Sequence, residues 1–329
     1  MRLPRFKLLQ PRFLDEAIDM AHRCGPSVRL VAGGTDLFVR MKYRVAQPQF
    51  VVSLKQLSVD PPSMDDEGNL RVSALTTLRE VVRSRIVAER APILSEAAHT
   101  VGSAQIRSMA TLGGNLCLET RCLYYNQGHE FQYVEPCFKR GGDRCYLVPK
   151  GRRCWAVFMG DTAPALISLD ARVEVASSSG PRTIPLERLY TNDSLSPISL
   201  LPVEILATVV IPTAAGRRGE AFVKLSARGG LDFAIVSAAA VLETEDSGTC
   251  SRAALVLGSA GACPLRAGQA ETQLQGRVIT KELIREAAHL AATEIRPVMH
   301  HERDASYLRH SVKVAAEEAL SLAFDRLSA

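Results

Sequence analysis

The nine residues VRLVAGGTD at positions 28–36 decide the fold, because an apolar run stops there abruptly at two adjacent glycines. The run Val28–Val31 predicts a strand, and the glycines predict a tight turn directly after it. Apolar residues at helical spacing predict helices over 13–24 and 37–43, and a further apolar run predicts a strand over 50–54. We therefore expect a compact βαβ-like unit at the start of the chain.

A second glycine pair lies in TLGGNL at positions 111–116, again beside a threonine. Glycine lets backbone N–H groups approach a ligand closely, and successive N–H groups in a turn form a concave anion site. The hydroxyls of Thr35 and Thr111 can donate further hydrogen bonds to phosphate oxygens. Two such turns in separate domains suit a pyrophosphate held between them; the alternative is that both are merely tight turns. Neither pair matches G-x-G-x-x-G or G-x-x-x-x-G-K-[ST], which disfavours Rossmann and P-loop folds.

The remainder of the chain predicts mixed helices and strands. Residues 59–69 hold prolines, acids and a glycine, and predict a loop or a domain boundary. The apolar patterns predict strands over 70–75, 165–169, 171–176, 203–211, 220–227, 234–242 and 253–257, and helices over 77–85, 92–101, 283–292 and 311–327. The last third of the chain is thus expected to be rich in strands and to end in helices.

Composition places the chain among ordinary globular proteins. It has 329 residues, 47% of them hydrophobic, and a formal net charge of +5. These values suit two or three domains with large cores and exclude a disordered chain. No run approaches about 18 apolar residues, and the N-terminal segment lacks an apolar signal core, so we expect no membrane span and a cytoplasmic location. The mild basic excess forms no helix stripe, and we expect no nucleic-acid partner.

Cysteine is concentrated in one stretch of the sequence. Of the eight cysteines, five lie within 117–155, at Cys117, Cys122, Cys137, Cys145 and Cys154. The stretch has no sustained helical or strand period, and a structureless segment of this length is uncommon unless it is functional. No C-x-x-C occurs, which disfavours a zinc ribbon, and a reducing compartment disfavours disulfides. Four converging thiolates can hold a [4Fe–4S] cluster and would order such a loop, but their spacing alone does not identify the metal.

Further short motifs accompany the two glycine pairs in a fixed order. AGGTD at 32–36 and TLGGN at 111–115 are followed by GDTAPA at 160–165, by KLS at 224–226, and by LGSA and PLRA within 257–267. Together these motifs resemble the flavoprotein subunits of the xanthine dehydrogenase and carbon monoxide dehydrogenase family of molybdenum hydroxylases, over nearly the whole chain. The resemblance implies an α+β fold, in which two lobes of the vanillyl-alcohol-oxidase/PCMH type enclose FAD and a C-terminal α+β domain follows.

The resemblance also implies domain boundaries. We expect an N-terminal FAD-binding lobe over 1–57 and a second FAD-binding lobe over 58–215, which contains the cysteine-rich insertion 117–155. A C-terminal flavoprotein domain is expected over 216–329.

The same resemblance assigns residues to the cofactor. The two glycine motifs would hold the diphosphate and ribityl chain of FAD, Asp161 would lie near the adenosine or isoalloxazine end, and Lys224 near the flavin ring. Taken alone, Asp161 is typical of a turn and Lys224 of a solvated strand edge. The expected FAD-binding residues are Leu30, Val31, Ala32, Gly33, Gly34, Thr35, Asp36, Val101, Ser103, Thr111, Gly113, Gly114, Asn115, Asp161, Leu206 and Lys224.

Most flavoprotein subunits of this family lack the cysteine-rich insertion, but the β subunit of 4-hydroxybenzoyl-CoA reductase has one. RCLYYNQ at 121–127, GDRC at 142–145 and RCW at 153–155 resemble that insertion. The resemblance implies a [4Fe–4S] cluster whose ligands are Cys122, Cys137, Cys145 and Cys154. It leaves Cys117 as a packed thiol.

By this resemblance the chain is the FAD and [4Fe–4S] electron-transfer subunit of a molybdenum-dependent 4-hydroxybenzoyl-CoA reductase, which forms benzoyl-CoA. A large subunit with molybdopterin and a small subunit with [2Fe–2S] clusters would complete a dimer of heterotrimers, and no catalytic residue is expected on this chain. One alternative is the FAD subunit of another molybdenum hydroxylase with a different aromatic substrate. A second alternative is a stand-alone flavoprotein whose cysteine loop senses redox state or binds zinc.

The insertion also gathers basic residues with a single acid, Asp143, among them. The basic residues are Lys139, Arg140, Arg144, Lys150, Arg152 and Arg153. They predict either a solvated loop that offsets the negative charge of a cluster or a docking surface for an acidic electron donor such as ferredoxin.

Overall fold

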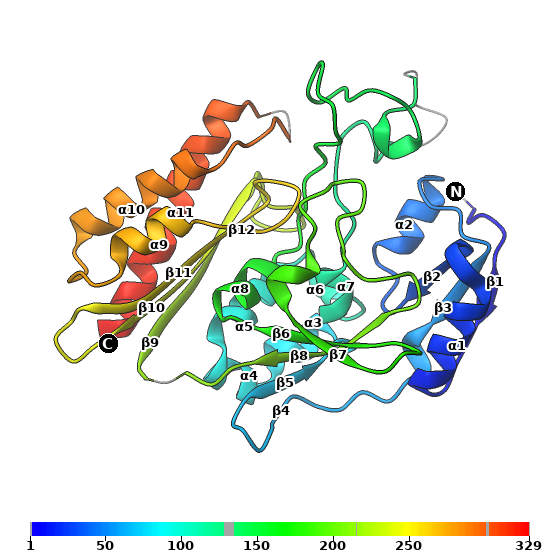
Figure 1. The fold of residues 1–329 in the computed structure, drawn as a ribbon, viewed down its shortest axis with the longest axis horizontal. Helices are drawn as coiled ribbons and strands as arrows, with labels where there is room; N and C mark the ends of the chain where they lie inside the picture. Colours follow the sequence, from blue (N-terminus) through cyan, green and yellow to red (C-terminus); the bar gives the residue numbers. More distant parts are fainter. Residues whose placement is uncertain (1, 128–134, 215, 301–302, 329) are drawn as a thin grey trace.

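The computed structural model describes residues 2–127, 135–214, 216–300 and 303–328. Residues 128–134 of the cysteine-rich insertion therefore lie outside the described part of the chain. Three sheets follow one another along the sequence, each with its own helices, which confirms the expected α+β architecture (Figure 1). No described helix is both long enough and apolar enough to cross a membrane.

The N-terminal lobe is built on a small parallel sheet. Its elements are β1 (Lys7–Leu9), α1 (Leu14–Cys24), η1 (Gly25–Ser27), β2 (Val28–Val31), α2 (Leu37–Lys42), β3 (Phe50–Ser53) and η2 (Leu54–Gln56). The strand order is β1-β3-β2 with parallel pairing throughout, so the predicted βαβ-like unit is confirmed and gains a third strand. The apolar face of α1 buries Ala17, Ile18 and Ala21 in the core of this lobe.

The second lobe is an antiparallel sheet covered by short helices. Its strands are β4 (Ser63–Met64), β5 (Leu70–Ser73), β6 (Arg172–Ala176), β7 (Arg182–Pro185) and β8 (Ile205–Ile211), in the order β4-β5-β8-β6-β7. Its helices are α3 (Leu78–Arg83), α4 (Arg85–Arg90), α5 (Pro92–His99), α6 (Ala104–Arg107), α7 (Leu112–Leu116), α8 (Thr162–Ser168) and η5 (Leu186–Leu189). A capping box between Thr77 and Glu80 begins α3.

Two sequence predictions in this lobe are wrong. The strand expected over 165–169 is the end of α8, whose seven residues are all buried. A helix that is buried on every side shows no alternation of polar and apolar residues, so its sequence does not distinguish it from a buried strand. The second glycine pair is not a turn either, because Gly113 and Gly114 lie inside the short helix α7.

The C-terminal domain is a four-stranded antiparallel sheet between two layers of helices (Figure 1). Its elements are β9 (Arg218–Leu225), β10 (Val236–Thr244), β11 (Cys250–Gly258), β12 (Leu265–Arg266), α9 (Gly268–Leu274), α10 (Lys281–Glu294) and α11 (Ala305–Ser328). Helix α11 packs on β9 and β10, while α5 and α8 of the second lobe contact the sheet from its other face. Alternate residues of β10 therefore enter different cores, with Ala239 and Val241 in one and Ala238, Ala240 and Leu242 in the other.

The cysteine-rich insertion leaves the second lobe after α7 and projects from the body of the molecule as the green loop at the top of Figure 1. Its described residues hold one turn of helix, η4 (Phe138–Arg140). Its two ends are joined where the amide of Arg121 donates to the carbonyl of Val157 at 2.7 Å and the amide of Val157 donates back at 2.8 Å. The lack of regular structure predicted for this stretch is confirmed for its described residues.

Candidate functional site

The two lobes enclose a cleft of about 570 Å³. The first glycine loop and the start of α2 form one wall, and the second lobe contributes the segments around Val101 and Thr111. Arg121 of the insertion and the loop from Arg228 to Phe233 of the C-terminal domain complete the lining. All three parts of the chain thus meet at one site.

The first glycine loop lies directly against the second lobe. A Cβ atom on Gly33 would lie 1.8 Å from the carbonyl oxygen of Met109, so no larger residue fits without a shift of the backbone. Gly34 has a φ of +71°, a conformation that favours glycine. The backbone amides of Gly33, Gly34 and Thr35 have no partner among the described residues. Unpaired amides in the wall of a cleft suit an anionic ligand group such as a diphosphate.

The second glycine motif presents one of its two glycines to the cleft. The Thr111 hydroxyl oxygen caps α7 by accepting a hydrogen bond from the amide of Gly114 at 3.1 Å. The amide of Gly113 donates to the carbonyl of Ala74 at 2.8 Å, and this glycine faces the core. Thr111, Gly114 and Asn115 line the cleft. The Thr111 hydroxyl hydrogen can still be donated to a ligand.

Asp161 and Lys224 form a buried ion pair at the cleft wall. The ammonium of Lys224 donates to Asp161 Oδ2 at 2.7 Å and to the carbonyls of Thr100 and Asp232 at 2.9 and 3.0 Å. The second carboxylate oxygen, Oδ1, is buried and has no partner in the described part of the chain. Burial raises the pKa of Asp161 to about 6, although the charge of Lys224 opposes this rise. The interpretation of Lys224 as a solvated lysine is wrong, since its side chain is 6% exposed.

A network of charged side chains connects the cleft with the insertion. The Arg121 guanidinium pairs with Asp36 of the first glycine motif and lies 5.0 Å from the ring centre of Phe233. Glu119 accepts hydrogen bonds from Arg40 at 3.2 Å and from Lys139 at 2.7 Å. Lys139 is therefore a buried, paired residue and not part of an exposed basic rim, which corrects its placement from the sequence.

Twelve of the sixteen residues expected to bind FAD line the cleft. They are Leu30, Val31, Ala32, Gly33, Gly34, Thr35, Asp36, Val101, Thr111, Gly114, Asn115 and Asp161. The other four lie elsewhere: Gly113 in the core, Lys224 behind Asp161, Ser103 as the cap of α6, and Leu206 buried on β8. Leu206 lines a separate hollow with Ser73 and Leu75.

About half of the residues that line the cleft were not predicted from the sequence. The missed lining residues are Arg29, Leu37, Val39, Arg40, Gly102, Ile106, Ala110, Cys117, Leu118, Arg121, Met159, Arg228, Leu231, Asp232 and Phe233. Most of them flank the motifs and carry no signal of their own. Cys117 was expected to be a packed thiol, but it is exposed on the cleft wall.

The four cysteines expected to bind a cluster line a second, small pocket in the insertion. Cys122, Cys137, Cys145 and Cys154 all contribute to its wall, and all are free thiols. Burial raises the pKa of the Cys122 and Cys154 thiols. In residues 2–127, 135–214, 216–300 and 303–328, no group of three or more histidine, cysteine or acidic side chains is arranged to hold a metal ion.

Comparison with known proteins gives a consistent result. Residues 4–214 match the family described as the FAD binding domain in molybdopterin dehydrogenase, and residues 221–323 match the CO dehydrogenase flavoprotein C-terminal domain. The chain is 26% identical to 6-hydroxypseudooxynicotine dehydrogenase complex subunit alpha of Paenarthrobacter nicotinovorans, across 99% of this chain and 97% of that one. It is 30% identical to aldehyde oxidoreductase FAD-binding subunit PaoB of Escherichia coli, across 81% and 86%.

The fold is shared with solved structures as well. Carbon monoxide dehydrogenase from Hydrogenophaga pseudoflava superposes with a TM-score of 0.80 at 24% identity, across 99% of both chains. The chain therefore belongs to the xanthine dehydrogenase and carbon monoxide dehydrogenase family of molybdenum hydroxylases, as an FAD-binding oxidoreductase subunit. The predicted family and fold class are confirmed. The finer boundaries at residues 57 and 215 stay predictions.

Replacing Gly33 by Ala tests the close contact between the lobes. The added Cβ would collide with the Met109 carbonyl and push the glycine loop away from the second lobe. We expect FAD to bind at least about tenfold more weakly, which corresponds to about 1.4 kcal/mol. The measurement is a titration of the apo chain with FAD, followed by flavin fluorescence. Gly268→Ala is the matched control, because open space surrounds a Cβ there; equal FAD affinity of both variants would contradict the account.

Replacing Asp161 by Asn tests the burial of its carboxyl group. Because its pKa in the fold is raised above the ordinary 3.8 to about 6, the carboxyl contributes stability at low pH, and this is lost as pH rises through about 6. From about pH 4 to about pH 7, the free energy of unfolding of Asp161→Asn should rise relative to wild type by up to about 3 kcal/mol. Urea unfolding of the apo chain at both pH values measures this. A difference between the two proteins that does not change with pH would refute it.

Proposed function

We propose that this chain is the FAD and [4Fe–4S] electron-transfer subunit of a molybdenum-dependent 4-hydroxybenzoyl-CoA reductase. FAD exchanges one or two electrons and an iron–sulfur cluster one, so together they would connect a one-electron donor to a two-electron reduction. The observation that carries the proposal is the convergence of four free thiols on one pocket, in an insertion whose base forms part of the FAD cleft. The chain's own residues bind and orient the two groups.

The cleft residues suit FAD in chemical detail. The unpaired amides of the first glycine loop and the Thr111 hydroxyl would hold the diphosphate between the lobes. The unpartnered Asp161 Oδ1 could accept a hydrogen bond from a ligand N–H group. Lys224 would keep that carboxylate in place through the 2.7 Å ion pair and its two carbonyl contacts.

The thiol pocket suits a cluster in its donor set. Each iron of a [4Fe–4S] cube takes one thiolate, so the four sulfurs stand farther apart than the ligands of a single ion. The amide of Val148 already points at the Cys145 sulfur at 3.5 Å, and N–H groups directed at cluster sulfurs tune its potential. Thiolate–iron bonds would replace the apolar core that the insertion lacks.

The insertion is tied to the cleft by adjacent residues. Cys122 is the proposed cluster ligand, and its neighbour Arg121 lines the FAD cleft and pairs with Asp36. The hydroxyl oxygen of Tyr125, in the same segment, accepts a hydrogen bond from the Arg40 guanidinium at 3.3 Å. A short stretch of backbone thus connects the thiol pocket with the flavin site, which supports electron transfer between the two groups.

Partner subunits follow from the family. Relatives are described as a medium chain of carbon monoxide dehydrogenase and as an FAD-binding subunit, which implies further chains in those enzymes. For this protein we propose a large molybdenum-cofactor subunit and a small [2Fe–2S] subunit, assembled as a dimer of heterotrimers in the cytoplasm.

A second candidate is the FAD subunit of a molybdenum hydroxylase with another aromatic substrate. It is favoured by relatives named for 6-hydroxypseudooxynicotine and nicotinate dehydrogenation. Substrate profiling of the intact complex separates the two: benzoyl-CoA formed from 4-hydroxybenzoyl-CoA supports the first, and turnover of heteroaromatic substrates alone supports the second.

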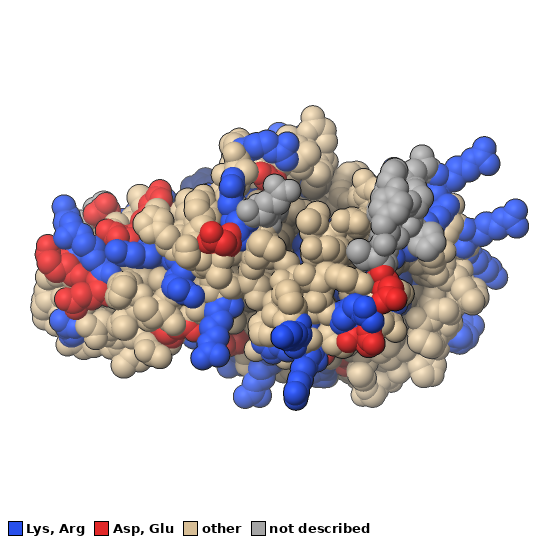
Figure 2. Space-filling model, turned by 90° about the horizontal axis from the view of Figure 1, so that it is seen from above, with Lys and Arg blue, Asp and Glu red and all other residues tan. Residues whose placement is uncertain are grey.

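The exposed basic residues of the insertion suit an acidic electron donor of the ferredoxin type. Lys150, Arg152 and Arg153 are exposed, whereas Arg144 is neutralised by Glu135 and Asp143. Figure 2 looks down on the face that carries the insertion, where basic and acidic side chains are interspersed. Charge reversal at Lys150 and Arg152 should slow reduction by ferredoxin at low salt with unchanged flavin content; unaltered rates would remove this docking role.

Replacing Cys145 by Ser tests the cluster. We expect the wild-type chain, purified without oxygen, to hold roughly four iron and four acid-labile sulfide. Cys145→Ser should lose most of both while it keeps FAD, because the thiol pocket and the FAD cleft have separate linings. Cys117→Ser is the control, since Cys117 lines the cleft and not the thiol pocket. About one zinc per wild-type chain, or full iron content in Cys145→Ser, would overturn the cluster assignment.

A further inference from the structure

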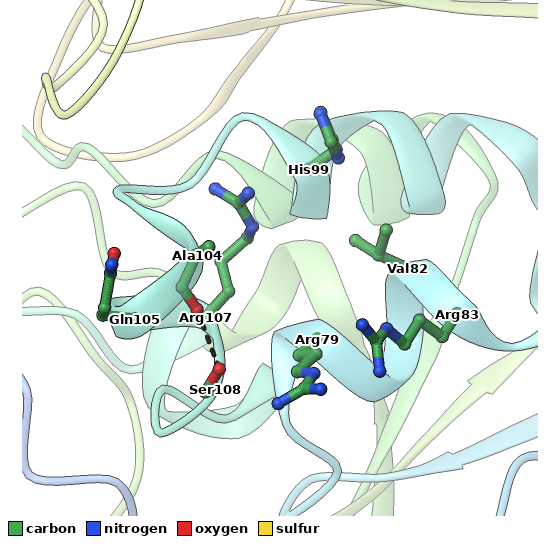
Figure 3. Close-up of a pocket in the computed structure, with 8 residues that line it drawn as sticks. All are labelled: Arg79, Val82, Arg83, His99, Ala104, Gln105, Arg107 and Ser108. Atoms are coloured by element: carbon green, nitrogen blue, oxygen red, sulfur yellow. Dashed lines mark hydrogen bonds between the residues drawn. The ribbon is translucent and has the colours of Figure 1, made fainter.

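A further concave site lies on the second lobe, with a lining separate from those of the FAD cleft and the thiol pocket. It is a hollow of about 440 Å³ formed by α3, α5 and α6. Figure 3 shows Arg79 and Arg83 of α3 on one side of this hollow and His99 of α5 with Arg107 of α6 on the other. Its remaining lining residues are Val82, Ala104, Gln105 and Ser108. No acidic residue belongs to this lining.

The positive charge of this arginine hollow is not neutralised by the protein. The side chains of Arg79, Arg83 and His99 are exposed and make no ion pair or hydrogen bond within the described residues. Three guanidinium groups that face one hollow repel one another weakly through water, and a bound anion would turn this repulsion into attraction. The nearest acids in the sequence are engaged elsewhere, Glu80 in the cap of α3 and Glu96 with Arg326.

Arg107 gives the hollow a fixed donor. Its Nη1 group donates to the carbonyls of Val101 at 3.0 Å and Gly102 at 3.3 Å, which holds the guanidinium plane in place. A guanidinium has five N–H groups, so others remain for a ligand. Val101 and Gly102 themselves line the FAD cleft, so Arg107 lies in the wall between the two cavities.

We propose that the arginine hollow is a binding site for a small phosphate-bearing anion. A phosphate group concentrates up to two negative charges and three acceptor oxygens in one tetrahedron, which several guanidinium groups can share. A carboxylate brings one charge, so an acidic peptide would need several repelling carboxylates within the same small volume. The concave shape and its size lie in the range of small-molecule sites. The absence of an aromatic residue from the lining gives no stacking surface for a nucleobase, so the phosphate is the recognised group.

The test uses the FAD-loaded chain, so that the FAD cleft, with the unpaired amides of the first glycine loop, is already occupied. Inorganic pyrophosphate is titrated by calorimetry at about 0.1 M salt, against the wild type and the double variant Arg79→Ala/Arg83→Ala. We expect saturable binding of one pyrophosphate per chain, weakened at least about tenfold in the double variant. Flavin content and melting temperature should stay unchanged, because both arginines are exposed. Arg309→Ala, which removes an exposed arginine from α11, should bind pyrophosphate like the wild type.

Three results would overturn the proposal. One is pyrophosphate binding that does not saturate or that is equal in all three proteins. Such binding would be non-specific association with the surface charge. Another is binding that disappears when FAD is present, which places the anion in the FAD cleft. The third is tight binding of a glutamate-rich peptide with no binding of pyrophosphate, which makes the hollow a protein docking surface.

Discussion

The close backbone contact between Gly33 and Met109 is the constraint on which the rest of the site depends. The loop after β2 lies so close to the second lobe that a Cβ atom on Gly33 would be 1.8 Å from the carbonyl oxygen of Met109. Only a residue without a side chain permits that approach, and it leaves the amides of Gly33–Thr35 in the wall of a shared cleft. The cleft is thus a property of the join between the lobes and not of either lobe alone.

The other two parts of the chain are fixed around this join. The C-terminal sheet packs against α5 and α8, and α8 begins directly after Asp161, so the Asp161–Lys224 pair ties that sheet to the cleft. The insertion is tied through Arg121, which pairs with Asp36 and stacks near Phe233. The Asp161–Lys224 pair is buried and the Arg121–Asp36 pair is half-buried. Buried pairs add little net stability, but removing one partner leaves a costly unpaired charge. We infer that the two ion pairs fix the positions of the C-terminal sheet and the insertion relative to the cleft.

Some parts of the fold and of the site could be predicted from the sequence, and others could not. The strand β2 and the turn after it were predicted because an apolar run followed by glycines is a strong local signal, and β10 was predicted from the apolar run 234–242. The second glycine pair was predicted as a turn, but it lies inside α7. Helix α8 was missed since a helix buried on all sides has no polar face. The role of Phe233 and the burial of Lys139 and Lys224 were not predictable, because their partners lie far away in the sequence. Leu206 was assigned to the cofactor by resemblance; it is a buried residue of β8 that lines a separate hollow.

We propose that the amides of the first glycine loop, together with the Thr111 hydroxyl, recognise the diphosphate of the flavin cofactor. The most direct measurement is the ratio of the dissociation constants of FAD and riboflavin for the apo chain, under one set of conditions. Riboflavin carries the same ring and ribityl chain but lacks the diphosphate and the adenosine that follows it. The account predicts that FAD binds at least about 100-fold more tightly, a difference of about 2.8 kcal/mol. Equal affinity for the two flavins would contradict it, because the amides between the lobes would then contribute nothing to recognition.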